Sequence, residues 1–242
     1  MKPAAFAYHR PATLGEALAL LAEDEEAKPL AGGQSLVPML NFRLARPPAL
    51  VDLADIEELA GIRVEDGVLV VGAMTRQWDL EHAPQAFPLL REALAFVGHT
   101  ATRCRGTVGG SLVHADPTAE LPVCALALGA ELVTNRRTIP AAEFFQAVFT
   151  TALEPGELLV EVRFPAPSGR TAFVEHAHRH GDFAVACVAR NGDLVAVGGV
   201  GATPVLWAGG ELDLRAVVGD LFAPAGYKRE VAKALVARAL AA

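Results

Sequence analysis

The sequence predicts an α+β fold in three lobes, residues 1–55, 56–165 and 170–242. Three observations support this. Short apolar strands alternate with short helical patterns up to residue 165. The run Pro165–Gly169 has the composition of a linker. Three closely spaced strand patterns and one amphipathic helix follow, as expected for an antiparallel sheet with a helix packed on it.

The first lobe contains a helix between two short strands. Thr13-Leu14-Gly15-Glu16 is a capping box, which marks the start of the helix. Apolar strands are predicted at 28–30 and 49–52, and a Gly-Gly step follows the first of them. This order predicts a small βαβ-type lobe.

The second lobe begins with a hairpin, residues 61–64 and 68–72, across Glu65-Asp66-Gly67. Thr75 is a candidate N-cap for a helix through Leu80, and Pro88 begins a helix over 89–97. Further along, the patterns predict helices at 119–128 and 143–148, and strands at 131–134 and 158–164.

The third lobe has strand patterns near 171–178, 183–190 and 194–200. An amphipathic helix follows from Tyr227 to Ala241. The longest uncharged stretch, 194–210, contains five glycines, so it is predicted to form a strand and turns rather than a membrane helix. The first residues, MKPAAFAYHR, contain no apolar leader core, which predicts a cytoplasmic protein.

Two glycine pairs, each followed closely by serine, are the most informative motifs. They are Ala31-Gly32-Gly33-Gln34-Ser35-Leu36 and Thr107-Val108-Gly109-Gly110-Ser111. A glycine pair permits positive φ and a close approach of ligand to backbone. Successive amide N–H groups in such a turn form an anion site, and a hydroxyl adds a donor. One such loop is usually an ordinary turn, but two together suggest that a dinucleotide is held by its diphosphate.

Several other classes of protein are excluded. The chain has neither G-x-G-x-x-G after a strand nor G-x-x-x-x-G-K-[ST], which disfavours a nicotinamide Rossmann domain and a P-loop nucleotidase. The net charge of −7 and the lack of a basic stripe disfavour nucleic acid. The three cysteines are scattered, cannot provide the four thiolates of an iron–sulfur cluster, and are interpreted as buried reduced thiols.

An ordered set of segments carries a family resemblance: LAGGQSLVP, PALVDL, RCRGTVGGSLVHADPTAELP, ELLVEVRFP and GDFAVA. With these segments, the chain resembles the FAD-binding medium subunit of the molybdenum hydroxylases, the family of aerobic carbon monoxide dehydrogenase and xanthine dehydrogenase. The resemblance implies a two-lobe FAD-binding domain of the PCMH type. A small C-terminal α+β domain with an antiparallel sheet follows it.

The resemblance also implies a set of residues in contact with FAD, mostly through backbone N–H groups. Glu120 occupies the place of a family aspartate; the alternative is a glutamate that stabilises the first turn of a helix. Leu159 matches a position that packs on the flavin, or it is simply a core residue. The full set is Ala31, Gly32, Gly33, Gln34, Ser35, Leu36, Thr107, Gly109, Gly110, Ser111, Glu120 and Leu159.

Further candidate residues lie near these loops. His114 either approaches the isoalloxazine ring or, as we favour, hydrogen-bonds the backbone. Asp116 is a candidate cap for the helix that follows it. Arg103 or Arg105 is expected to help neutralise the diphosphate.

Two features depart from the family pattern. Relatives have a lysine where this chain has Glu175, and an inward-pointing acid would repel the diphosphate. The segment between Gly210 and Tyr227 is also shorter than in relatives. Separately, His176-Ala177-His178-Arg179-His180 would place three imidazoles on one strand face. No cysteine or carboxylate completes a first shell, so an ordinary strand is favoured over a metal site.

The resemblance implies an oxidoreductase subunit that carries electrons through FAD. No acid–base pair or nucleophile stands out, and the flavin supplies the redox chemistry. Expected partners are a large molybdopterin subunit and a small [2Fe–2S] subunit in a dimerised heterotrimer, with NAD⁺, a quinone or O₂ as acceptor. The alternatives are a stand-alone flavin oxidoreductase of the same fold, or an assembly module that has lost FAD, which Glu175 would favour.

Overall fold

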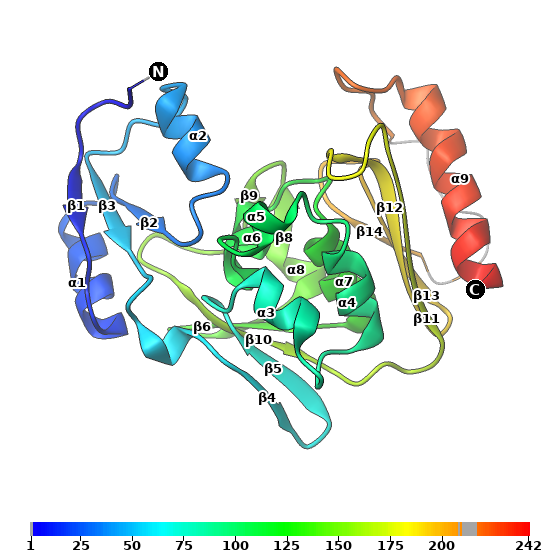
Figure 1. Ribbon diagram of the computed structural model, residues 1–242, viewed down its shortest axis with the longest axis horizontal. Helices are drawn as coiled ribbons and strands as arrows, with labels where there is room; N and C mark the ends of the chain where they lie inside the picture. The colour runs from blue at the N-terminus through cyan, green and yellow to red at the C-terminus, as the bar shows by residue number, and fades with distance from the viewer. Residues whose placement is uncertain (1, 208, 210–216) are drawn as a thin grey trace.

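The computed structural model describes residues 2–207, 209 and 217–242. Figure 1 shows the first lobe at one side, the helices and sheet of the second lobe in the middle, and the last sheet with α9 at the other side. Helices accompany antiparallel sheets, which confirms the predicted α+β fold. The lobe boundaries at 55/56 and 165/170 stay a prediction.

The first lobe is a three-stranded parallel sheet, β1 (Ala7–His9), β3 (Ala49–Asp52) and β2 (Lys28–Leu30) in spatial order. Helix α1 (Leu14–Glu23) connects β1 to β2, and α2 (Leu36–Asn41) follows the first glycine pair. Both predicted strands are confirmed. Strand β1 was missed because its three residues are all exposed and show no apolar alternation.

The capping box has a shifted geometry. The Thr13 side chain accepts from the N–H of Glu16 at 3.2 Å, as predicted. The Glu16 carboxylate reaches back to the N–H of Ala12, at 2.9 Å, rather than to that of Thr13. Two amides at the start of α1 are still satisfied, so the sequence marked the helix start correctly.

The second lobe is built on a five-stranded antiparallel sheet. Its order is β4 (Ile62–Glu65), β5 (Val68–Gly72), β10 (Leu159–Phe164), β6 (Glu131–Thr134) and β7 (Thr138–Pro140). Strand β10 is the last of these five strands along the chain, yet it lies in the centre of the sheet between β5 and β6. The short helix η1 (Glu57–Leu59) precedes the sheet, and the hairpin of β8 (Phe145–Ala147) and β9 (Thr150–Thr151) flanks it.

Short helices pack on this sheet: α3 (Gln77–His82), α4 (Pro88–Leu94), α5 (Thr100–Arg103), α6 (Val108–His114), α7 (Glu120–Leu128) and α8 (Ala141–Phe144). Every residue of α7 is buried, because α4 and α6 pack on it from one side and β12 and β13 from the other. Gly129 ends α7 at φ 64°, as its sequence position predicted.

Two predictions in this lobe are wrong. Residues 143–148 do not form a helix. Helix α8 ends at the buried Phe144, and Phe145 begins the β8–β9 hairpin. Thr75 does not cap α3, because its hydroxyl accepts from the N–H of Gly61 at 3.0 Å and donates to the carbonyl of Gly61 at 2.9 Å. The N-cap of α3 is Arg76.

The third lobe is a four-stranded antiparallel sheet, β11 (Thr171–Ala177), β12 (Ala184–Asn191), β13 (Leu194–Gly198) and β14 (Val205–Trp207). Helix α9 (Ala225–Ala241) covers one face of this sheet (Figure 1). The opposite face packs on α7 and shares its hydrophobic core. Residues 210–216 of the segment expected to be short lie outside the described residues. No helix in the described ranges is long and apolar enough to cross a membrane.

Candidate cofactor site

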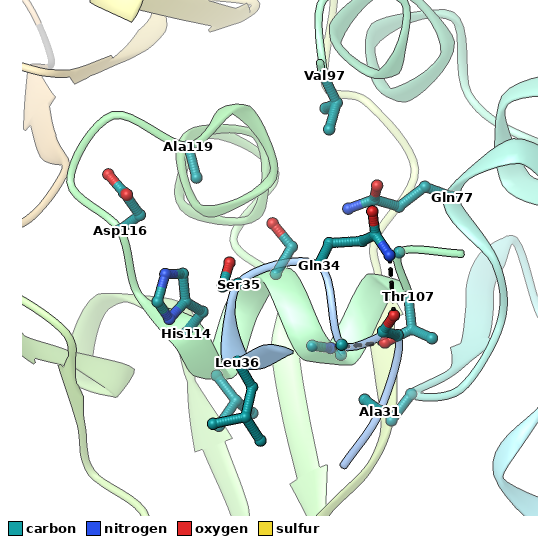
Figure 2. Close-up of a pocket in the computed structure, with 18 of the residues that line it drawn as sticks. Ala31, Gln34, Ser35, Leu36, Gln77, Val97, Thr107, His114, Asp116 and Ala119 are labelled. Carbon is teal, nitrogen blue, oxygen red and sulfur yellow. Dashed lines mark hydrogen bonds between the residues drawn. The ribbon is translucent and has the colours of Figure 1, made fainter. Parts of the chain in front are cut away.

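A cavity of about 510 Å³ lies where the first lobe meets the second. Its walls come from the first glycine pair, the start of α6, the start of α7 and the start of β10. Residues 181–183 of the third lobe also reach it. All the residues that the family resemblance implies for FAD contact, from Ala31 to Leu159, line this one cavity. Figure 2 shows several of them around it.

The first glycine pair forms a turn with unused amide groups. Gly33 has φ 71°, in the left-handed region that favours glycine. Among the described residues, the N–H groups of residues 32–36 have no acceptor within the protein. The next amide, that of Val37, donates to the Gly33 carbonyl at 3.0 Å and begins the α2 ladder. The turn therefore presents consecutive free N–H groups, which is the anion-binding arrangement that the sequence predicted.

Gly32 brings this turn directly against the second lobe. A Cβ at Gly32 would collide with the Arg105 carbonyl oxygen and would lie 2.8 Å from the Cα of Gly106. Both obstacles are backbone atoms, so no side chain can move to make room. The two lobes are in backbone contact at the edge of the cavity only because this residue is glycine.

The second glycine pair is the first turn of helix α6 and not a loop. Thr107 is its N-cap and accepts from the N–H of Gly110 at 3.0 Å. The amides of Val108, Gly109 and Ser111 donate to carbonyls of Thr75, Ala73 and Thr107. The expectation that both glycine pairs offer free N–H groups is therefore wrong for this one.

Glycine serves close packing in α6. A Cβ at Gly109 would lie 2.6 Å from the Cβ of Ala73, and a Cβ at Gly110 would lie 2.7 Å from the Thr107 hydroxyl oxygen. Neither residue has positive φ. The contribution of α6 to the cavity is a wall without side chains, flanked by the side chains of Thr107 and Ser111.

Gln77 is a cavity residue that sequence reasoning missed. It is 4% exposed, and its Oε1 atom is buried without a hydrogen-bond partner among the described residues. Its side chain extends from α3 toward that of Gln34 in the first lobe (Figure 2). A glutamine near the start of a short helix has no distinguishing sequence pattern. Only the tertiary structure shows that it is buried at the cavity.

His114 and Asp116 line the same cavity but not in the favoured roles. The His114 ring stacks on Phe149 with centroids 4.9 Å apart and makes no hydrogen bond to described residues, so the favoured backbone bond is wrong. Burial lowers its pKa, which favours the neutral ring. Asp116 does not cap α7, whose N-cap is Ala119. Its carboxylate accepts from the N–H and hydroxyl of Thr118, at 2.8 and 2.7 Å.

Glu120 and Leu159 are both buried at the cavity wall. Glu120, the first residue of α7, is 7% exposed, and burial raises its pKa to about 7, with a contribution from Asp116. Leu159 is 5% exposed at the start of β10 and belongs to the main hydrophobic core. Leu159 is therefore a core residue that also lines the cavity, and its contact with the flavin stays a prediction.

The predicted arginine contribution is wrong for Arg103. Its guanidinium pairs with Glu81 at 2.7 Å and donates to the Val97 carbonyl at 3.0 Å, so it is committed within the protein. Arg105 is exposed and does not line the cavity. In the described part of the chain, the cavity walls contain no lysine or arginine. An anion bound here must be stabilised by the free amides.

Glu157 lines the cavity wall, but its carboxylate points away from the cavity, toward hydrogen-bond partners in the protein. Its side chain is fully buried and accepts from the Thr134 hydroxyl at 2.7 Å and from Arg137 Nε at 3.0 Å. The Arg137 hydrogen bond holds its pKa down at about 2. This charge is therefore already compensated inside the protein.

Glu175 does not line the cavity. Its Oε2 atom is buried and has no partner among the described residues. Burial and the neighbouring Glu120 raise its pKa to about 8. The carboxyl group therefore does not lie directly against the cavity, as the concern about an inward-pointing acid had assumed.

The histidine run does not place three imidazoles on one strand. Strand β11 ends at Ala177 with a bulge after His176. His176 Nε2 contacts the Tyr227 hydroxyl at 2.9 Å, and His178 Nε2 contacts the Phe222 carbonyl at 3.2 Å. The described residues contain no group of three His, Cys, Asp or Glu side chains suited to a metal ion. Of the cysteines, Cys124 and Cys187 are buried as expected, but Cys104 is exposed.

The fold and the cavity define a class of protein: an α+β domain with a cavity between two lobes and a turn of free amides at its edge. Residues 4–167 match the family described as the FAD binding domain in molybdopterin dehydrogenase. Similar proteins include the caffeine dehydrogenase subunit beta of Pseudomonas sp. (strain CBB1), 45% identical over 76% of this chain and 66% of that protein. The carbon monoxide dehydrogenase medium chain of Afipia carboxidovorans is 39% identical over 86% of this chain and 78% of that one.

Solved structures agree with the sequence matches. Carbon monoxide dehydrogenase from Hydrogenophaga pseudoflava superposes with a TM-score of 0.92 at 35% identity, covering 100% of this chain and 98% of that chain. Quinoline 2-oxidoreductase from Pseudomonas putida 86 gives a TM-score of 0.91, also at 35% identity, over 99% and 96%. The chain belongs to the FAD-binding domain family of the molybdopterin dehydrogenases, and its cofactor is FAD. It spans about two thirds of the length of the curated caffeine dehydrogenase relative.

Proposed function

We propose that FAD binds in the cavity between the first and second lobes, with its diphosphate on the amides of residues 32–36. The free N–H groups of this turn support the assignment, because the cavity walls in the described residues offer no cationic side chain. Gly32 and Gly33 leave the turn without side-chain atoms at the point of closest approach. The residues present therefore fit a dinucleotide.

The opposite wall would hold the rest of the cofactor. Thr107, Gly109, Gly110 and Ser111 form a surface of small residues at the start of α6. Leu159 adds an apolar contact, and Gln77 has a buried amide oxygen available as an acceptor. When bound, FAD supplies the redox chemistry. The chain contributes orientation, shielding from water and the electrostatic environment.

We further infer that the protein is an electron-transfer subunit. Electrons would arrive from [2Fe–2S] clusters on a small partner subunit, after substrate oxidation on a large molybdopterin subunit, and leave FAD for an external acceptor. The names of the similar proteins support this, since they are subunits of dehydrogenases. The chain's free cysteines, one exposed and two buried, provide no cluster site of their own. We place the assembled heterotrimer, itself dimerised, in the cytoplasm.

Co-expression with a large molybdopterin subunit and a small [2Fe–2S] subunit of this family tests the proposal. A tag on this chain should recover both partners in equal amounts, with FAD and iron bound. Substrate should then bleach both the flavin and the cluster absorbance. In a variant that no longer binds FAD, the clusters should still be reduced while the acceptor is not.

Two outcomes would contradict the proposal in different ways. Reduction of an acceptor by the purified chain alone, with an organic substrate, would identify a stand-alone flavin oxidoreductase. A colourless protein that still recovers both partners would identify an assembly module without FAD.

A further inference from the structure

Glu120 and Glu175 lie on elements that pack together behind the cavity wall. Helix α7 packs on β12, and Glu175 of β11 pairs with Cys187 of β12. Glu120 begins α7 and faces the cavity. Glu175 lies on β11, where side chains alternate between the two faces of the sheet. Phe173, on the same face as Glu175, packs against Phe96 with ring centroids 5.5 Å apart. His176, on the other face, contacts Tyr227 of α9. Glu175 therefore points toward the second lobe.

Neither carboxyl group has a counter-ion among the described residues. Glu120 is 7% exposed, and Glu175 Oε2 is buried without a hydrogen-bond partner. The one guanidinium that acts on Glu120 is that of Arg103, which is already paired with Glu81 at 2.7 Å. Two carboxyl groups are thus buried near each other without a cation of their own.

The other titratable groups around the pair are acidic or neutral. Asp116 precedes α7 and raises the pKa of Glu120. Glu92, on α4, accepts from the N–H of Phe173 at 3.1 Å. The thiols of Cys124 and Cys187 are fully buried beside the pair, and burial raises their pKa. None of these groups supplies positive charge, so the environment of the pair favours retention of a proton.

Two neighbouring carboxyl groups in a poorly solvated site do not both ionise easily. Burial raises the pKa of Glu120 to about 7, and burial together with Glu120 raises that of Glu175 to about 8. Because the groups interact, their two protons leave in steps that belong to the pair and not to either residue alone. The pair therefore retains at least one proton at pH 7.

We propose that Glu120 and Glu175 share a proton and thereby limit the negative charge beside the anionic cofactor, so that FAD affinity falls when this proton is lost. Glu175 is a positioning residue in this scheme, because it acts on the cavity through Glu120. The inference rests on the proposed placement of FAD. It gives Glu175, where relatives were aligned with a lysine, a role that does not require a cation.

The test is the pH dependence of FAD affinity in the full chain, measured by flavin fluorescence titration between about pH 6.5 and 9.5. Wild type should bind FAD at least about 10-fold more weakly at pH 9 than at pH 7, since each proton lost changes affinity by up to tenfold per pH unit. The double variant Glu120→Gln, Glu175→Gln should show no such fall. Each single variant should keep one ionisation, with a smaller fall. Glu131→Gln, at an exposed position on β6, is the matched control and should behave as wild type.

A flat wild-type profile, or a double variant with the same fall as wild type, would overturn the proposal. An infrared measurement on the FAD-free protein separates it from the proposed function. A protonated-carboxyl band near neutral pH, lost in the double variant, shows the shared proton without any cofactor. If that band is present but FAD binds at no pH, the proposed placement of FAD is wrong, but the proposal that Glu120 and Glu175 hold a proton is still supported. If the band is absent, the proton pair itself is refuted.

Discussion

Replacing Gly33 by alanine should weaken FAD binding without unfolding the protein. Gly33 has φ 71°, and an added Cβ would lie 3.1 Å from Val37 Cγ2 and 3.3 Å from Leu30 Cδ1. Holding alanine in this conformation costs roughly 1–2 kcal/mol. The side chains of Val37 and Leu30 can shift by a few tenths of an ångström. The strain is relieved if the turn opens, and an open turn no longer directs its amides toward the diphosphate.

The expected loss is therefore about 5- to 30-fold in FAD affinity, the binding equivalent of 1–2 kcal/mol. Gly67→Ala is the matched control, because Gly67 has φ 82°, lies in the turn between β4 and β5, and has open space around an added Cβ. Both variants should lose similar folding stability, and only Gly33→Ala should lose affinity. Reconstitution with FAD, followed by visible absorbance and calorimetry, measures both quantities. Equal affinity in Gly33→Ala and wild type would refute the role of this turn.

Three further expectations follow from the described contacts. Glu175→Lys should place a cation beside the acidic cavity wall and tighten FAD binding by about 5- to 30-fold at low salt, with a gain that shrinks as salt rises; unchanged affinity at low salt would contradict this. Changing His176 and His178 together to glutamine should leave FAD content unchanged, and elemental analysis of wild type should find no stoichiometric metal. Arg137→Met should destabilise the protein at pH 7, because it removes the partner of the buried Glu157 carboxylate. Because Arg137 depresses the pKa of Glu157 to about 2, its stabilisation is present above the unfolded pKa near 4.5, and denaturation curves of the variant and wild type should converge as pH falls toward 2.

The sequence predicted best the helix ends that are marked by a proline or a glycine. Pro88 and Gly129 mark helix ends that the structure confirms within a few residues. The antiparallel sheets and the last helix followed from apolar periodicity. Strands β1 and β14 were missed, because three-residue edge strands with exposed side chains carry no periodic signal.

Tertiary contacts decided the features that sequence could not show. The pair Gly109-Gly110 has the same composition as Gly32-Gly33, yet one pair is helical and the other forms a turn with positive φ. The difference lies in the partners of their amides: Gly109 donates to the carbonyl of Ala73 on a distant segment, and Gly110 donates to the Thr107 hydroxyl. In the same way, local sequence gave no sign that Arg103 pairs with Glu81 instead of an anion.

Helix α7 sets the order in which the chain can mature. Its nine residues are all buried, partly by β12 and β13, and residues 181–183 complete the cavity wall. Before the third lobe has been synthesised, the side of α7 that packs on β12 and β13 is uncovered, and the cavity lacks the part of its wall that residues 181–183 form. A fragment that stops near residue 167, where the family match ends, would keep α7 in that state. With FAD placed in this cavity, loading is expected only after the third lobe has folded, and truncated chains are expected to be substrates for chaperones rather than smaller flavoproteins.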